Sequence, residues 1–383
     1  MDTAYDVIVI GVGSMGSSAC YFLSKAGLRV LGLEQYGIVH EQGSHTGQTR
    51  IIRKAYFEDP SYVPLLVRAY QLWAQLEQLS GEKLFYRTGL LYAGTPGHSL
   101  LAGVRESARA YAIDVASWDS TQLKQHFPQF HFPTGWEILF EADAGFVRPE
   151  ATILAYTKFA RALGASIHEN EKVLDWTCTD SHVTVKTRQG IYHAAKLVIT
   201  AGSWAGQLVP GLRQKISVSR QVLAWMQPAI TARYEPARFP CWMLAMEDVP
   251  GCYYGFPYVD EESFGAPAGL KLAHHTPGNA TNPERVDRHV LPSEVAPLRE
   301  IITTYFHGDF SDGDAKTCLY ANSPDENFMI DLLPGTESRV AIAAGFSGHG
   351  FKFVPVVGEI LAGLIVEGST DLPVGFLSLN RFQ

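Results

Sequence analysis

The sequence lacks the features that mark several large classes of protein. It has no basic run and carries a formal net charge of -8, which argues against nucleic acid as a partner. No stretch approaches the roughly 20 apolar residues of a membrane span, so we expect no membrane partner either. There is no low-complexity tract and no internal repeat. These absences leave an ordinary globular protein whose partners are small molecules.

Cysteine is also scarce. No C-x-x-C motif occurs, which argues against a structural zinc site, and we expect no metal. The five cysteines are scattered and odd in number, which suits a reducing cytoplasm: Cys20, Cys178, Cys241, Cys252 and Cys318. The polar residues 1–5 leave no room for a signal peptide, and residues 379–383 are not a peroxisomal tripeptide. We therefore expect a cytoplasmic protein.

The sequence is rich in hydrophobic residues, which make up 46% of its 383 positions. That content is ample for a large core, and the length predicts two domains or one large domain with an insertion.

The first 34 residues carry a pattern typical of nucleotide binding. Residues 6–10 are β-branched and apolar, as in a buried parallel strand. Gly11, Gly13 and Gly16 then fit the G-x-G-x-x-G fingerprint, whose glycines allow a tight turn, approach to a pyrophosphate and close helix packing. A helix over residues 15–25 would point its N-terminal N–H groups at that pyrophosphate.

A second strand over residues 29–33 leads directly into Glu34. This acid follows the glycines by about 20 residues, where a carboxylate usually holds a ribose hydroxyl. The fingerprint alone does not separate NAD from FAD.

The rest of the chain alternates helical and strand patterns. Helical spacing covers residues 62–79 and 100–111, and buried strands are expected at 197–204 and 340–344. The polar loop 37–49 precedes Arg50 and Arg53, which share one face if the segment is helical. Solvated surface charges and an anion-binding pair are equally open readings of these two arginines.

This order of elements predicts a nucleotide domain built from three separate parts of the chain, with a substrate domain inserted twice. The expected nucleotide segments are 1–85, 145–215 and 318–383, and the expected substrate segments are 86–144 and 216–317.

Several longer motifs are more specific than the glycine fingerprint. They are Gly43-Ser44-His45, Thr49-Arg50-Ile51-Ile52-Arg53, Tyr253-Tyr254-Gly255-Phe256-Pro257, Gly269-Leu270-Lys271, His275, Cys318-Leu319-Tyr320, Ser323-Pro324-Asp325-Glu326, Ile330-Asp331 and residues 345–353. Together they resemble the monomeric sarcosine oxidase family of flavoprotein amine oxidases, which includes N-methyltryptophan oxidase. The resemblance runs nearly end to end and favours FAD over NAD.

The resemblance implies an α/β fold. It consists of a Rossmann-like FAD-binding domain of the glutathione-reductase type and an inserted α+β substrate domain with a largely antiparallel sheet. It also implies a monomer. A closing helix that starts near Gly350 would point its N-terminus at the N1–C2=O edge of the flavin.

The resemblance also implies roles for individual residues. Cys318 resembles the cysteine joined covalently to the flavin, although most intracellular cysteines are simply buried thiols. Lys271 resembles the lysine that activates oxygen, although an edge-strand lysine in water is more common in general. Arg53 and Lys352 resemble the pair that holds the substrate carboxylate.

The remaining site residues follow from the same motifs. Arg50 resembles the arginine beside the flavin ring, and the implied catalytic set is Lys271, Arg50, His275 and Tyr254. The implied substrate contacts are Arg53, Lys352, Tyr254, Tyr320 and Gly348. The implied FAD contacts are Gly11, Gly13, Ser14, Met15, Gly16, Glu34, Ser44, His45, Thr49, Arg50, Val173, Ala201, Gly202, Trp204, Cys318, Gly345, Gly348, His349, Gly350, Phe351 and Lys352.

The sequence departs from the family pattern in two places. Thr46 and Gln48 stand where the family often has a histidine and an aspartate, which changes the charges near the flavin. The stretch between Tyr254 and Lys271 is also longer, so the size of the substrate cannot be transferred from the family.

The implied activity is an oxidase of secondary amino acids, such as sarcosine or N-methyltryptophan. Hydride passes from the carbon attached to nitrogen to FAD, the imine hydrolyses, and O2 is reduced to hydrogen peroxide. Three alternatives stay open: an oxidase of cyclic or primary amino acids (proline, pipecolate, glycine), a dehydrogenase that passes electrons to a protein acceptor, and a non-catalytic flavin-binding protein.

Overall fold

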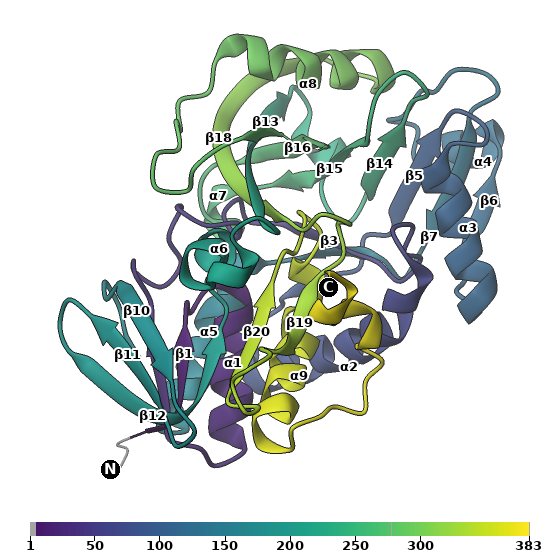
Figure 1. Cartoon of the computed structure of the whole chain (residues 1–383). Coiled ribbons are helices and arrows are strands. Elements are labelled where there is room, and N and C mark those ends of the chain that lie inside the picture. Colours follow the sequence, from purple (N-terminus) through teal and green to yellow (C-terminus); the bar gives the residue numbers. More distant parts are fainter. Residues whose placement is uncertain (1–4, 277, 383) are drawn as a thin grey trace.

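The computed structural model describes residues 5–276 and 278–382, and these residues form two large β-sheets and a small one (Figure 1). The eight-stranded sheet has the order β10-β11-β12-β1-β2-β9, with β20 added to β12 and β19 to β20. Its strands are β1 (Tyr5–Ile10), β2 (Val30–Leu33), β9 (Ser166–His168), β10 (Val173–Cys178), β11 (Val183–Thr187), β12 (Ile191–Ile199), β19 (Met329–Leu332) and β20 (Val340–Ala344).

The centre of this sheet is parallel. β1 pairs in parallel with β2 and β12, and β12 pairs in parallel with β20. Helix α1 (Ser14–Lys25) connects β1 to β2, so the predicted strand–turn–helix–strand unit is confirmed. Segments from the start, middle and end of the chain therefore lie side by side, as the purple, teal and yellow-green strands in Figure 1 show.

The nine-stranded sheet has the order β17-β13-β16-β15-β14-β5-β7-β6, with β18 also paired to β13. All its pairs are antiparallel except β14 with β5. Its strands are β5 (Leu90–Gly94), β6 (Ala116–Trp118), β7 (Glu137–Glu141), β13 (Ser217–Pro228), β14 (Cys241–Ala245), β15 (Cys252–Val259), β16 (Gly269–His275), β17 (Asn279–Ala280) and β18 (Phe310–Asn322).

The small sheet has the order β3-β8-β4, from β3 (Arg50–Ile52), β8 (Gly145–Val147) and β4 (Phe85–Tyr86). The remaining helices are α2 (Val63–Ser80), α3 (Ser99–Tyr111), α4 (Ser120–His126), α5 (Pro149–Ala162), α6 (Ala205–Leu208), α7 (Glu261–Phe264), α8 (Pro292–Tyr305) and α9 (Val354–Val366). Among the described residues, no helix combines the length and apolar character that crossing a bilayer would need.

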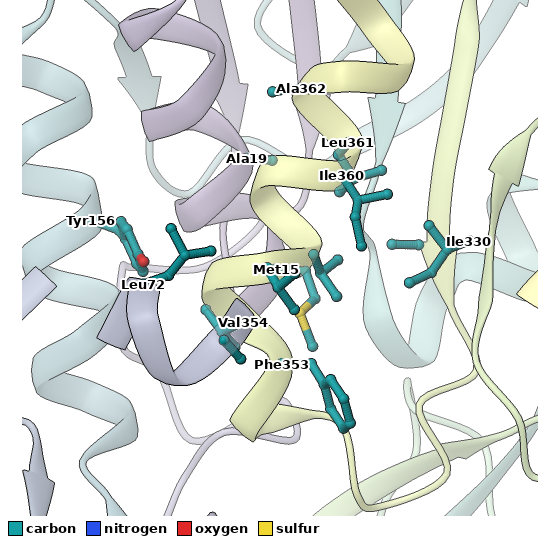
Figure 2. Packing of buried hydrophobic residues seen from close by; sticks show 14 of the residues in the cluster. Met15, Ala19, Leu72, Tyr156, Ile330, Phe353, Val354, Ile360, Leu361 and Ala362 are labelled. Atoms are coloured by element: carbon teal, nitrogen blue, oxygen red, sulfur yellow. The ribbon is translucent and has the colours of Figure 1, made fainter. Parts of the chain in front are cut away.

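The largest core packs one face of the eight-stranded sheet against α1, α2, α5 and α9. Figure 2 shows Met15 and Ala19 of α1 near Val354, Ile360, Leu361 and Ala362 of α9. These side chains are almost fully buried. Burying an aliphatic or aromatic side chain contributes about 1.5–3 kcal/mol, so this contact fixes the last helix against the first.

Two local details differ from the helical alternatives considered for the sequence. Residues 50–52 form the edge strand β3, because Arg50 to Ile52 pair with β8, so the condition under which Arg50 and Arg53 would share a helix face is not met. The closing α-helix begins at Val354, because Phe351–Phe353 form a 3-10 turn before it. The division into five domain segments stays a prediction, and strand β18 crosses its expected boundary at residue 318.

Candidate active site

A cavity of about 350 Å³ lies at the carboxyl ends of the central parallel strands. Most of the predicted FAD contacts line it: Gly11, Gly13, Ser14, Met15, Glu34, Ser44, His45, Arg50, Val173, Ala201, Gly202, Trp204, Gly348, Gly350 and Phe351. Gly16, Thr49, Cys318 and Gly345 are not among the lining residues, and His349 and Lys352 line a second cavity.

The glycine turn has the shape that a pyrophosphate requires. A Cβ on Gly16 would lie 1.8 Å from the Gly11 carbonyl oxygen, so only glycine permits this approach of helix to strand. A Cβ on Gly13 would meet nothing closer than His45 Nδ1 at 4.0 Å, so the backbone there is open to the cavity. No side chain caps the N-terminus of α1, which leaves its N–H groups free for an anion.

Glu34 lies at the end of β2, in the wall of this cavity. Its carboxylate accepts hydrogen bonds from the N–H groups of Val12 at 2.9 Å and Tyr36 at 3.0 Å. Burial raises the pKa of Glu34 to about 7. The side chain is therefore rigid and in place to contact a ribose hydroxyl.

Polar atoms without partners indicate a ligand of the same kind. His45 Nε2 and Ser203 Oγ are buried without a hydrogen-bond partner among the described residues, and both residues line the cavity. Buried polar atoms are normally paired, so these two fit a polar ligand. With the open glycine turn and Glu34, the residues present fit FAD.

A second, smaller cavity of about 50 Å³ adjoins the first and shares Arg50, Gly348 and Phe351 with it. It is lined by Arg50, Ile51, Arg53, Glu58, Met243, Tyr254, His275, Gly348, His349, Phe351 and Lys352. Arg53 and Lys352, almost three hundred residues apart in the sequence, are thus brought to one pocket beside the dinucleotide cavity.

Arg53 is not a free cation in this pocket. Its Nη2 atom donates to both carboxylate oxygens of Glu58 at 2.6 Å, and its Nη1 atom donates to the Ala55 carbonyl at 3.0 Å. The guanidinium carbon also lies 4.3 Å from the ring centres of Tyr56 and Phe57. Sequence reasoning missed Glu58; a carboxylate five residues after a predicted anion-binding arginine is the signal that could have found it.

Glu58 stays ionised although it is buried. Burial alone would raise its pKa, but Arg53, His349 and Lys352 lower the pKa to about 2. The pocket therefore carries Arg53, Lys352 and one internal carboxylate. A substrate carboxylate must share or replace the contact that Glu58 makes with Arg53.

Lys352 lies in the 3-10 turn Phe351–Phe353 before α9. Its Nζ donates to the His349 carbonyl at 2.6 Å and lies 5.2 Å from the Tyr56 ring centre. Burial, followed by the charge of Arg53, lowers the pKa of Lys352 to about 7, while Glu58 opposes that change.

The two histidines of the pocket are neutral at physiological pH. Burial lowers the pKa of His275 to about 4 and that of His349 to about 3. His349 Nε2 lies 3.0 Å from the Glu326 carbonyl, which can only accept, so Nε2 carries the proton and Nδ1 accepts from the Tyr56 hydroxyl. His275 Nδ1 lies 3.3 Å from the Tyr320 hydroxyl.

Tyr254 and Tyr320 complete the polar wall. Burial raises the pKa of Tyr254 to about 12 and that of Tyr320 well above its ordinary value, so both phenols keep their protons. Gly348 packs against the Tyr320 ring, because a Cβ there would lie 2.2 Å from a ring carbon. Of the five predicted substrate contacts, Arg53, Lys352, Tyr254 and Gly348 line the smaller cavity, and Tyr320 lines the larger one.

Lys271 lies in an interior strand, because β16 is flanked by β13 and β15. Its side chain is buried, which excludes an edge lysine that points to water. Nζ donates to the carbonyls of Gly47 and, at 2.6 Å, Thr49, and lies 4.3 Å from the Phe256 ring centre. Burial holds the pKa of Lys271 well below its ordinary value.

Arg50 lies between the two cavities and fixes the loop before it. It donates to the carbonyls of Ser44 at 2.8 Å, Thr46 at 2.7 Å and Thr49 at 2.8 Å. Its guanidinium therefore shares the Thr49 carbonyl with Lys271.

Cys318 is a buried free thiol on β18, and the next residues, Leu319 and Tyr320, line the larger cavity. Burial raises its pKa, whereas the charges of Arg50 and Lys271 lower it. The neighbouring Lys316 does not help to lower the pKa of Cys318, because its Nζ pairs with Glu41 at 2.6 Å on the surface.

The two departures from the family pattern contact each other. The Gln48 amide donates to the carbonyls of Gly265 and, at 3.0 Å, Pro267, both in the lengthened stretch, and accepts from Trp225 Nε1 at 3.1 Å. An aspartate would have no N–H group to donate to these carbonyls. The presence of Gln48 is therefore explained by its hydrogen bonds to the longer segment, and not by the charges that the family has at this position.

Comparison with known proteins agrees with this site. The sequence model of a family described as FAD dependent oxidoreductase matches residues 6–364. The chain belongs to this family. A monomeric sarcosine oxidase from Streptomyces avermitilis is 40% identical, with 100% of this chain and 98% of that protein covered. An N-methyl-L-tryptophan oxidase from Salmonella dublin is 38% identical, with 99% of each chain covered.

The resemblance inferred from the motifs is thereby confirmed, and the chain is an FAD-dependent oxidoreductase. Two solved structures show the same fold at 23% identity and a TM-score of 0.84. One is NikD, an unusual amino acid oxidase, with 98% of this chain and 97% of that chain covered. The other is an L-proline dehydrogenase from P. horikoshii, with 100% and 98% covered.

Proposed function

We propose that this enzyme is an oxidase of secondary amino acids that carry an N-methyl group, with FAD as cofactor and O2 as electron acceptor. The observation that carries the proposal is the small pocket with two buried cations, Arg53 and Lys352, which opens onto the dinucleotide cavity. The names of the relatives support the same substrate class. When bound, FAD supplies the hydride acceptor and the electrons that reduce O2.

The residues of the pocket bind and orient the substrate. Lys352 and Arg53 hold the substrate carboxylate, and the neutral His275 and the phenols of Tyr254 and Tyr320 form uncharged walls. The substrate amine must itself be neutral, because a protonated nitrogen has no lone pair to stabilise the forming iminium. Neutral walls favour that form, because they do not stabilise an ammonium charge.

We further propose that Lys271 is the cation at which O2 reacts, and that Cys318 carries the flavin covalently. The fold then divides into a glutathione-reductase-type FAD-binding domain and an inserted substrate domain. A monomeric enzyme of the cytoplasm fits the names of the relatives and the cysteine usage.

The test of the function is a substrate panel scored by hydrogen peroxide release. N-methyl amino acids should give the highest kcat/KM, above cyclic and primary amino acids. A preference for proline, pipecolate or glycine would instead show that the substrates are cyclic or primary amino acids. Substrate bleaching of the flavin without peroxide release would instead favour a dehydrogenase.

Cys318→Ser tests the covalent bond. Wild-type protein precipitated with acid should stay yellow, and the Cys318→Ser protein should release its colour. Cys252→Ser is a matched control, because it removes another buried free thiol and should keep the colour in the pellet. Colour lost from the wild type on denaturation contradicts the covalent bond.

Acetate, a carboxylate without an amine, should bind more weakly as the pH rises through about 7. Lys352 is protonated below its lowered pKa of about 7 and loses its charge above it. The dissociation constant, measured from the flavin absorbance, should rise by up to about tenfold per pH unit above 7. Lys352→Met should remove this dependence, and a dependence that persists there would assign it to another group.

A further inference from the structure

A tight turn at residues 47–49 lies next to Lys271 and is held from both sides. Gly47 and Gln48 have positive φ angles of 103° and 65°, and the Thr49 N–H donates to the Gly47 carbonyl at 2.7 Å. The carbonyls of Gly47 and Thr49 accept from Lys271 Nζ. The position of the lysine charge therefore depends on the shape of this turn.

Glu150 binds the other side of the same turn. Its Oε1 accepts from the N–H of Gly47 at 2.9 Å and from that of Gln48 at 3.1 Å. The peptide group that joins Gly47 to Gln48 thus donates its N–H to a carboxylate and gives its carbonyl to an ammonium. Hydrogen bonds in such a chain polarise and strengthen one another, because the local dielectric is low.

Glu150 is held in place by its own helix. It follows Pro149 in the first turn of α5, where the helix dipole favours a negative charge. Among the described residues, Glu150 forms no ion pair of its own, so its charge is not cancelled by a nearer cation. Sequence reasoning missed this residue; an acid directly after the proline that opens a helix is the available signal.

The other groups that face Lys271 do not replace this charge. Burial and the like charge of Arg50 lower the pKa of Lys271, whereas Glu150, Cys318 and Cys241 raise it. Burial also raises the pKa of both thiols, so they are neutral near pH 7. Glu150 is thus the carboxylate that opposes loss of the lysine proton.

We propose that Glu150 is a positioning residue for Lys271: through the peptide between Gly47 and Gln48 it keeps the ammonium charged and fixed between two carbonyls. The coupling of the two residues stands on the hydrogen bonds alone. Its kinetic consequence rests on the proposed reaction of O2 at Lys271.

The first test is a double-mutant cycle on the melting temperature of the holoenzyme, which needs no turnover. Glu150→Gln keeps an acceptor oxygen and removes the charge. It should lower the melting temperature by about 2–4 °C in the wild type and by less than half as much in Lys271→Met, since the cation is already gone. An additive cycle overturns the proposal.

Glu77→Gln is the matched control for this cycle. Glu77 Oε1 also accepts two consecutive backbone N–H groups, from Leu84 at 2.8 Å and Phe85 at 2.9 Å. Among the described residues, no lysine side chain donates a hydrogen bond to the carbonyls of that segment, and the adjacent Lys83 lies over the Tyr86 ring instead. The effect of Glu77→Gln should be the same with Lys271 and with Met at that position. If Glu77 and Glu150 showed equal interactions with Lys271, the cycle would be measuring a general loss of stability, and the proposal would be overturned.

The second test is the pH profile of flavin reoxidation by O2 after reduction with dithionite, which requires no knowledge of the substrate. Reoxidation should be fast while Lys271 is protonated and slow above its pKa. Glu150→Gln should move this fall to lower pH by about one unit, because a nearby negative charge is lost. Should Lys271→Met fail to fold, this profile decides alone, and an unshifted profile overturns the proposal. A shifted profile in an enzyme that oxidises no N-methyl amino acid would reject the proposed substrate and keep the Glu150–Lys271 coupling.

Discussion

Replacing Lys271 with Met should slow reoxidation of the reduced flavin by O2 about a hundredfold or more, while anaerobic reduction by substrate changes much less. Transfer of the first electron places negative charge on oxygen, and a fixed buried cation stabilises that charge as it develops. Losing one such electrostatic contact commonly costs 10²–10³ in rate, hence the size of the expected effect. Stopped-flow measurement of the two half-reactions separates them.

Methionine is the suitable replacement because it keeps the length of the side chain and removes the charge. Lys316→Met is the control, since it removes a cation that is paired with Glu41 at the surface. It should reoxidise at the wild-type rate. If Lys271→Met also reoxidises at that rate, oxygen reacts elsewhere.

Lys352→Met should reduce kcat/KM for an N-methyl amino acid by about ten- to a hundredfold. A charge-assisted hydrogen bond to a carboxylate is worth ~1.5–3 kcal/mol, and each 1.4 kcal/mol is about tenfold. The decarboxylated amine should lose little, because it never used the contact. Steady-state kinetics with both compounds measures the difference; equal losses for the two, or none for the amino acid, contradict the role of Lys352.

Arg53 needs a different design, because it also neutralises Glu58. Arg53→Met alone leaves a buried carboxylate without its partner, which costs roughly 3–5 kcal/mol of stability. Arg53→Met combined with Glu58→Gln removes both charges together. This double variant should be more stable than Arg53→Met, and its kcat/KM for the carboxylated substrate should still lie below the wild-type value. A double variant with wild-type kcat/KM for that substrate excludes Arg53 from carboxylate binding.

The local elements were predictable where a pattern repeats over neighbouring residues. The β1–α1–β2 unit, the spacing of α2 and the strand at Val340–Ala344 follow from periodicity and glycine placement, and all are present. Strand β3 could not be predicted in this way, because a three-residue edge strand is too short to show a periodic pattern. Its pairing with β8, almost one hundred residues later, decides its conformation.

The predicted site residues were reached from motifs, and the structure places most of them in two adjoining cavities; Gly16, Thr49, Lys271, Cys318 and Gly345 line neither. The motifs did not indicate what those residues contact. The bond of Glu58 to Arg53 changes the charge of the carboxylate pocket, and the bonds of Gln48 to Gly265 and Pro267 join two departures that looked separate.

The sequence alone determined the nucleotide-binding unit and the residue types of the active site, because both depend on short segments whose chemistry is local. The tertiary structure decided the electrostatics. Glu150 and Gly47 are 103 residues apart, and Lys271 and Gly47 are 224 residues apart. Contacts between such distant positions leave no periodic pattern, and the protonation of a buried lysine depends on which charges the fold places around it.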